Sequence, residues 1–120
     1  MANEISCTLK LSVTKGNLVH VENPGVANIT LNGSNASGGV ASIGTSAEAL
    51  PMGDTGTPGY AFFRNTDTTN YVEIGTGTTT FTTFMKLKAG ESSIVRLGTS
   101  APSARANTAA VNLQYYILSD

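Results

Sequence analysis

The chain has 120 residues, a formal net charge of −1 and charged side chains at 12% of its positions, compared with roughly 25% in an average soluble domain. It has no basic run, which argues against nucleic acid and against an anionic membrane surface as partners. Its single cysteine, Cys7, excludes an internal disulfide framework, and its length predicts one domain with one core.

The first predicted element is a strand that begins at Ile5 and ends near Val13, because apolar and polar residues alternate there. This alternation predicts one face on the core and one face in water or against a polar partner. Cys7 is on the apolar phase, so we interpret it as a small buried residue rather than a reactive thiol. The opening residues lack the pattern of a signal peptide, and no apolar run is long enough to span a bilayer. We therefore expect synthesis in a cytoplasm without export by a standard signal.

The pattern is less regular over the next part of the chain. A short strand is predicted at residues 18–21, and Asn23-Pro24-Gly25 predicts a turn before a strand at about residues 26–31. Residues 33–59 contain most of the glycines and little periodicity, with at most one helical turn at 45–50. We predict a long irregular loop at about 33–59, and we expect partner contacts there because such loops are often functional.

The second half of the chain has the strongest strand signals. Ala89-Gly90 predicts a tight turn between the third and fourth of its strands, and the last segment alternates again from Val111 to Ile117. Together the segments predict an all-β fold, a single-domain antiparallel β-sandwich or jelly roll of roughly eight strands over residues 1–120. The predicted strands of this half cover residues 60–63, 71–74, 81–87, 93–97 and 108–118.

Two patterns are typical of catalytic sites. Asp54-Thr55-Gly56 matches the active-site triplet of aspartic proteases, in which two close carboxylates share a proton. Residues 52–53 are Met-Gly where those enzymes have an apolar strand, so we interpret the triplet as a turn in which Asp54 bonds its own backbone. His20 is the single histidine and no Gly-x-Ser-x-Gly elbow accompanies it, so we interpret it as a strand residue with an ordinary hydrogen bond.

The other ionisable and aromatic side chains do not form a recognisable site. Asp67, Glu73 and Glu91 lack the spacing of a calcium loop and are predicted to lie on solvated faces. Tyr60 and Tyr71 could stack on sugars, but cross-strand packing is the more frequent role of strand aromatics. The sequence therefore predicts a binding protein without catalytic residues, metal or cofactor.

The run PGYAFFRNTDTTNYVEIG, the run FMKLKAGESSIVRLG and the closing AVNLQYYILSD resemble small β-structured virion proteins of tailed bacteriophages, and the head decoration (cement) proteins are the most similar group. The resemblance implies a subunit that forms homo-oligomers, most often trimers, and binds the major capsid protein on the capsid exterior after synthesis in the host cytoplasm. The alternative is another virion component, such as a head fibre, tail or baseplate module that binds a receptor or glycan.

Strand phase predicts where partners bind. If alternate residues from Val111 to Ile117 face the core, Tyr116 and Leu118 face the opposite side. A neighbouring apolar pair near a chain end is a candidate contact, so we predict that both residues pack against a neighbouring subunit. Leu50, Pro51 and Met52, in the predicted loop, are the predicted contact with the capsid.

Overall fold

The computed structural model describes residues 3–98 and 101–120, and these residues form ten strands and no helix. Every strand pairing in them is antiparallel, so the predicted all-β antiparallel sandwich is confirmed, with two strands more than the roughly eight expected. The chain divides into two compact units, one ending at Asn32 and one running from Gly33 to Asp120. The sandwich therefore begins at residue 33, whereas the sequence pattern predicted that it spans residues 1–120. The strands are β1 (Ile5–Lys15), β2 (Leu18–Ile29), β3 (Ala36–Ile43), β4 (Glu48–Ala49), β5 (Pro58–Asn65), β6 (Val72–Thr76), β7 (Thr82–Leu87), β8 (Ser92–Arg96), β9 (Ser103–Ala106) and β10 (Val111–Ser119).

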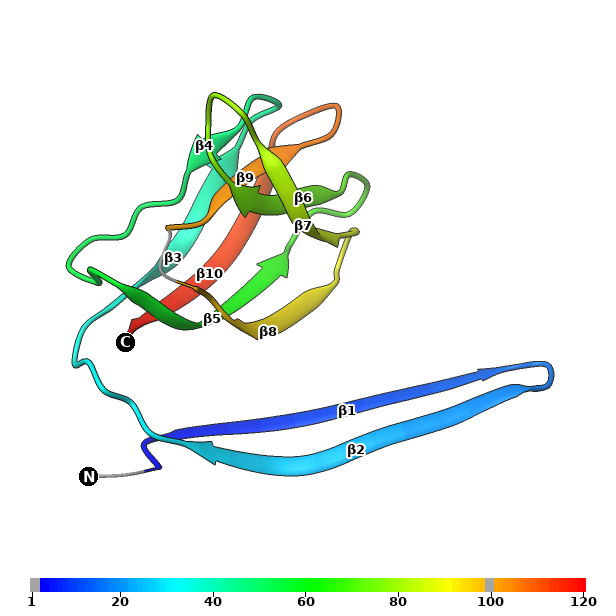
Figure 1. Ribbon diagram of the computed structural model, residues 1–120. Coiled ribbons are helices and arrows are strands. Elements are labelled where there is room, and N and C mark those ends of the chain that lie inside the picture. The colour runs from blue at the N-terminus through cyan, green and yellow to red at the C-terminus, as the bar shows by residue number, and fades with distance from the viewer. Residues whose placement is uncertain (1–2, 99–100) are drawn as a thin grey trace. The chain divides into compact units, whose positions relative to one another are not determined.

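The first unit is a long hairpin of β1 and β2 (Figure 1). Lys15 pairs with Leu18, so a two-residue turn joins the strands. Its first residue, Gly16, has a φ of 57°, a left-handed conformation that glycine adopts without strain. The turn lies between the predicted strands at residues 5–13 and 18–21.

A bulge lies near the middle of this hairpin. Asn23 and Pro24 of β2 together oppose Lys10 of β1, because the register shifts at that point. The Asn23 side chain accepts a hydrogen bond from the backbone N–H of Gly25 at 3.1 Å, and Gly25 has a φ of 80°. The turn predicted here is thus a bulge inside one continuous strand, since the ladder resumes on its far side.

The apolar phase of β1 does not form part of a sandwich core. Leu9, Leu11 and Val13 are 44%, 65% and 37% exposed, so the prediction that this face lies on the core is wrong for these residues. The hairpin forms a two-stranded sheet of its own. Cys7 is buried, as its position on the apolar phase of the strand predicted. It is the single cysteine of the chain and is free.

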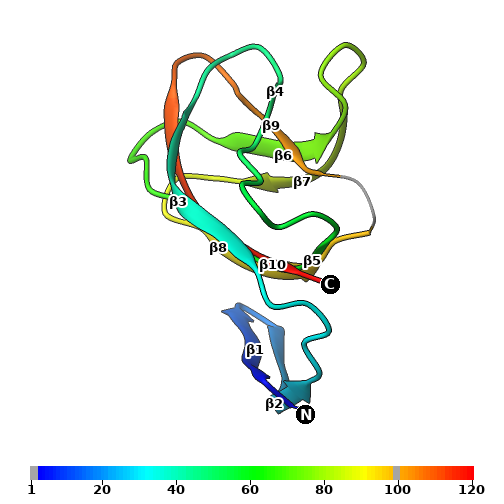
Figure 2. The ribbon, with the colours of Figure 1, turned by 90° about the vertical axis from the view of Figure 1, so that its left-hand side faces the viewer.

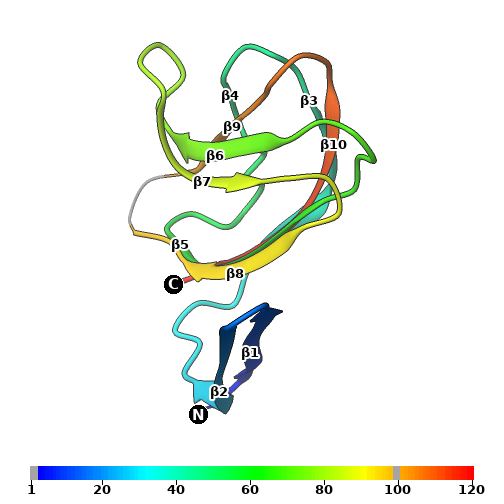
Figure 3. The same ribbon diagram turned by 90° about the vertical axis from the view of Figure 1, so that its right-hand side faces the viewer.

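The second unit consists of two four-stranded sheets (Figures 2 and 3). One has the strand order β3-β10-β5-β8, and the other has the order β4-β9-β6-β7. Their inner faces share one apolar core, which forms because alternate residues of each strand point inward. The largest fully buried side chains of this core include Phe63, Ile43, Ile74, Leu113 and Ile117.

The predicted irregular loop at residues 33–59 is wrong where β3, β4 and the start of β5 lie. The residues of β3 that face the core are small except at its end, because Ser37 and Gly39 pair with Ile117 and Tyr115 of β10, and Ile43 is the one large core residue of the strand. Small residues have low strand propensity and give no visible alternation. Pairing with β10, rather than local preference, makes this segment a strand.

Candidate functional site

Strand β10 alternates between the core and the surface. Its alternate residues from Val111 to Ile117 are at most 5% exposed, as predicted. Tyr116 is 52% exposed and Leu118 is half-buried on the opposite face of the sheet. The predicted orientation of both side chains is confirmed, whereas their contact with a neighbouring subunit stays a prediction.

Tyr116 is part of an apolar row that crosses all four strands of its sheet. It pairs with Gly38 of β3 and with Phe62 of β5, and Phe62 pairs with Ile94 of β8. Directly paired residues share a face of the sheet, so these side chains lie side by side. Ile94 is 39% exposed and Phe62 is half-buried.

Two further apolar residues extend this row along the strands. Val40 is two residues from Gly38 on the same face and is 63% exposed, and Leu118 is two residues from Tyr116. An exposed apolar cluster of this kind is typical of an interaction site. We call the cluster the Tyr116 patch; its members are Val40, Phe62, Ile94, Tyr116 and Leu118.

The orientation of the Tyr116 ring depends on Gly38. A Cβ atom built on Gly38 would overlap the Cδ1 atom of Tyr116 and would lie 3.1 Å from the carbonyl oxygen of Tyr115. The ring therefore covers the backbone of β3 where a side chain would otherwise stand. A residue larger than glycine at this position would displace the ring at the centre of the patch.

The rim of the patch is polar. The guanidinium of Arg96 lies 4.5 Å from the centroid of the Tyr60 ring, and its Nη1 atom donates to the Oδ1 atom of Asp120 at 3.3 Å. Arg64 is exposed and pairs with Gln114 at the other end of the patch. An apolar centre inside a polar rim is the usual composition of a protein–protein interface.

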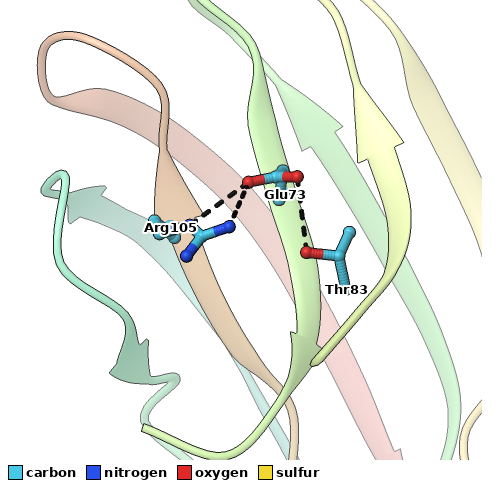
Figure 4. A network of polar contacts seen from close by, with 3 residues as sticks. All are labelled: Glu73, Thr83 and Arg105. Carbon is cyan, nitrogen blue, oxygen red and sulfur yellow. Dashed lines mark hydrogen bonds and ion pairs between the residues drawn. The ribbon is translucent and has the colours of Figure 1, made fainter. Parts of the chain in front are cut away.

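The outer face of the second sheet has a different chemistry (Figure 4). Glu73 accepts hydrogen bonds from Nε and Nη2 of Arg105 at 3.2 and 2.8 Å and from Oγ1 of Thr83 at 3.3 Å. The ammonium group of Lys86 lies 4.7 Å from the centroid of the Tyr71 ring. These paired charges are typical of a solvated face, so the Tyr116 patch is the stronger candidate for docking.

The residues predicted to contact the capsid divide between core and surface. Leu50 is 2% exposed and packs in the core, and its backbone N–H donates to the carbonyl of Pro102 at 3.1 Å. Met52 is half-buried against the same core, and Pro51 is exposed. Leu50 is therefore not available to a partner, because the core needs its side chain.

The residues that resembled a catalytic pattern are not members of the Tyr116 patch. Asp54 is exposed in a turn that the N–H of Thr55 closes on the carbonyl of Met52 at 2.9 Å. The predicted turn is therefore present, but the bond that closes it joins two backbone groups and does not involve the Asp54 side chain. His20 lies on the hairpin, where its Nε2 atom and the Oε1 atom of Glu22 are 2.7 Å apart, which agrees with an ordinary strand histidine. Within residues 3–98 and 101–120, no three His, Cys, Asp or Glu side chains are grouped as metal ligands.

The surroundings of Asp67 shift the pKa of its carboxyl group. The backbone N–H groups of Asn70 and Thr69 donate to its Oδ2 atom at 2.6 and 3.0 Å. These bonds lower the pKa of Asp67 below its ordinary value of 3.8, because they stabilise the carboxylate. The interaction shapes the loop after β5 and brings no second acidic group to it, so it is structural.

A hollow of about 340 Å³ opens beside β7 and β8 and is large enough to hold a small ligand. Thr76 and Arg96 supply polar side chains to its lining, and the guanidinium of Arg96 already contacts Asp120 and Tyr60. The apolar lining is contributed by Phe84, Val95, Leu97 and Pro102. Sugar binding needs several convergent polar groups, which this lining does not offer.

The sequence interpretation missed three members of the Tyr116 patch, namely Val40, Phe62 and Ile94. The phase of β5 could have identified Phe62, because its two neighbours, Ala61 and Phe63, both point into the core. Comparison of the chain with protein-family models, with curated proteins and with solved structures gives no match. Among the described residues there is no helix of the length and apolarity needed to cross a membrane. The chemistry of the surface is therefore the basis for a functional proposal.

Proposed function

We propose that this chain is a structural virion protein that decorates the capsid of a tailed bacteriophage and binds the major capsid protein through the Tyr116 patch. The observation that carries the proposal is the patch itself, in which an apolar row crosses one sheet and Tyr116 and Val40 are 52% and 63% exposed. The resemblance of residues 58–97 and of the C-terminal strand to decoration proteins supports the same function.

The proposal revises which residues contact the capsid. Of the three residues predicted for the loop contact, Leu50 has its side chain in the core and Met52 is partly buried against it. The Tyr116 patch offers the docking surface that the loop does not. Tyr116 and Leu118 then contact the shell, rather than a neighbouring subunit as the strand phase suggested.

The architecture suits a protein that acts by adding an interface. The central strands of the patch, β10 and β5, are paired on both sides, and the edge strands β3 and β8 are paired on one side. The backbone is therefore already ordered before a partner binds, which lowers the entropic cost of binding. A ligand that binds only the assembled shell stabilises it, by about 2.7 kcal/mol per site at a free concentration 100-fold above Kd. No chemical step is needed for this activity.

Binding to heads tests the proposal. Purified protein is mixed with heads of the encoding phage that lack it, and the heads are sedimented. We expect Tyr116→Ala/Leu118→Ala to reduce the bound protein by more than about tenfold, because truncating central apolar residues of an interface typically costs 1–2 kcal/mol or more each. Phe84→Ala is the matched control, since Phe84 is 51% exposed and lies outside the patch.

Two further measurements distinguish the alternatives. Light scattering of the double variant should give the same mass as the parent; a lower mass would return Tyr116 and Leu118 to a subunit interface. A cryo-EM map of complete particles should show the protein at regular positions on the head. Density at the tail or baseplate alone would favour a receptor- or glycan-binding virion module, and undiminished sedimentation of the double variant would remove the patch from the binding surface.

A further inference from the structure

The hairpin of β1 and β2 exposes apolar side chains on both of its faces. Strand pairing assigns the faces, because directly paired residues point to the same side. We call them the Leu11 face and the Val21 face. Leu9, Leu11, Val13 and Leu18 lie on the Leu11 face and are 44%, 65%, 37% and 59% exposed. Val19, Val21 and Val26 lie on the Val21 face and are 64%, 55% and 58% exposed.

A hairpin of this kind needs a partner. An isolated two-stranded sheet is at best marginally stable in water, and here its exposed side chains include seven large apolar residues. Large exposed apolar surface is rare unless another molecule covers it. Both faces have this character, so the partner has to cover two sides.

The two-sided pattern restricts how copies of the chain could associate. In a two-fold dimer the same face of each copy meets its equivalent, so one face of every hairpin would stay in water. In a heterologous arrangement the Leu11 face of one copy meets the Val21 face of the next. Every hairpin then has both faces covered, and closing the ring requires a third copy.

Two opposite charges near the middle of the hairpin lie on different faces, and Lys15 lies on the Leu11 face at its turn end. Lys10 is on the Val21 face, beside the bulge. Glu22 is on the Leu11 face, where it is paired across the strands with Leu11 and its Oε1 atom lies 2.7 Å from Nε2 of His20. Lys10 and Glu22 are therefore at almost the same level along the hairpin but on opposite sides, so they cannot pair within one copy. Rotation about an axis parallel to the hairpin preserves that level and places Lys10 of one copy beside Glu22 of the next.

We propose that the hairpins of three or more copies of this chain stack heterologously, the Leu11 face of each on the Val21 face of the next, with Lys10 paired to Glu22 across each contact. The hairpin is thus the self-association element. This inference concerns self-association alone and does not depend on which surface the sandwich binds.

Mixed variants of the full chain test the arrangement by light scattering coupled to size exclusion. Leu11→Thr disables one face and Val21→Thr disables the other, and threonine keeps the strand propensity of both positions. We expect the parent to have the mass of at least three copies. Each variant alone should stay monomeric even at a concentration about tenfold above the one at which the parent assembles. An equal mixture should form a one-to-one dimer, since it retains one intact contact. That dimer also shows that both variants are folded.

Charge reversal supplies an independent test. Lys10→Glu and Glu22→Lys should each weaken self-association by about tenfold or more, and the double reversal should restore it, because the pair forms only between copies. Lys88→Glu, an exposed position on the sandwich, is the control and should have no effect. The proposal would be overturned if the parent were monomeric, or if it formed a dimer that Val21→Thr did not disrupt. It would also be overturned if the two threonine variants did not form a dimer when mixed, or if the double charge reversal did not restore self-association.

Discussion

Replacing Asn65 by alanine should destabilise the sandwich strongly. Asn65 ends β5, is 0% exposed and uses its whole side chain. Its Nδ2 atom donates to the carbonyls of Asn70 and Leu87 at 2.9 and 3.0 Å, and its Oδ1 atom accepts from the N–H of Asp67 at 2.9 Å. The side chain thus joins the loop after β5 to the end of β7.

The expected magnitude follows from the number of these bonds. A typical intramolecular hydrogen bond contributes about 1 kcal/mol, and a buried group that loses its partner costs about 1–3 kcal/mol. Three bonds are lost at Asn65, although water can reach some of the released groups because the loop is at the surface. We therefore expect the free energy of unfolding to fall by about 3 kcal/mol.

Urea unfolding of the full chain, followed by circular dichroism, measures this change. For a domain of this size about 3 kcal/mol corresponds to a decrease in Tm of about 12–24 °C. Asn112→Ala is the matched control, because Asn112 is exposed on β10 and its replacement should change stability by less than about 0.5 kcal/mol. A loss at Asn65 below about 1 kcal/mol would refute the reasoning that its hydrogen bonds hold the two segments together.

Three further predictions concern single positions. The pKa of Asp67 is lowered, so its carboxylate stabilises the fold above the ordinary pKa of 3.8, and this contribution is lost as pH falls through the folded-state pKa. Asp67→Asn should therefore flatten the acid side of a curve of stability against pH. An unchanged curve would contradict the assignment. Gly38→Ala should cost about 1–3 kcal/mol in urea unfolding and reduce head binding, because the new Cβ overlaps the Tyr116 ring; parent-like values in both assays would show that the ring moves freely. Glu73→Gln should lower the free energy of unfolding by less than about 1 kcal/mol in the same assay, because the Glu73 and Arg105 side chains are 21% and 39% exposed. A decrease of more than about 2 kcal/mol would show that the network is more strongly coupled.

The sequence predicted the second half of the fold well because its strands have a local signal. Strands β5 to β8 begin and end within two residues of the predicted segments, and the turn at Ala89-Gly90 is present, with the Glu91 N–H bonded to the Lys88 carbonyl at 3.0 Å. Aromatic and β-branched residues in these strands fit a pleated surface whatever their partner. The hairpin was predicted less well, because alternation in β1 shows a two-sided strand without showing that a core lies beside it.

The sequence missed β3, β4 and β9, and the first of these also completes the candidate site. Gly38 and Gly39 give β3 no propensity or alternation of its own, and Gly39 has a φ of 147°, so pairing with β10 is what makes the segment a strand. The absence of a side chain at Gly38 is at the same time what allows the Tyr116 ring to lie across β3 and join Val40 to Phe62 on one surface. Gly38 therefore explains why the sequence predicted neither the strand β3 nor the apolar patch. It provides no local strand signal, and it shapes the patch only once β3 and β10 are paired.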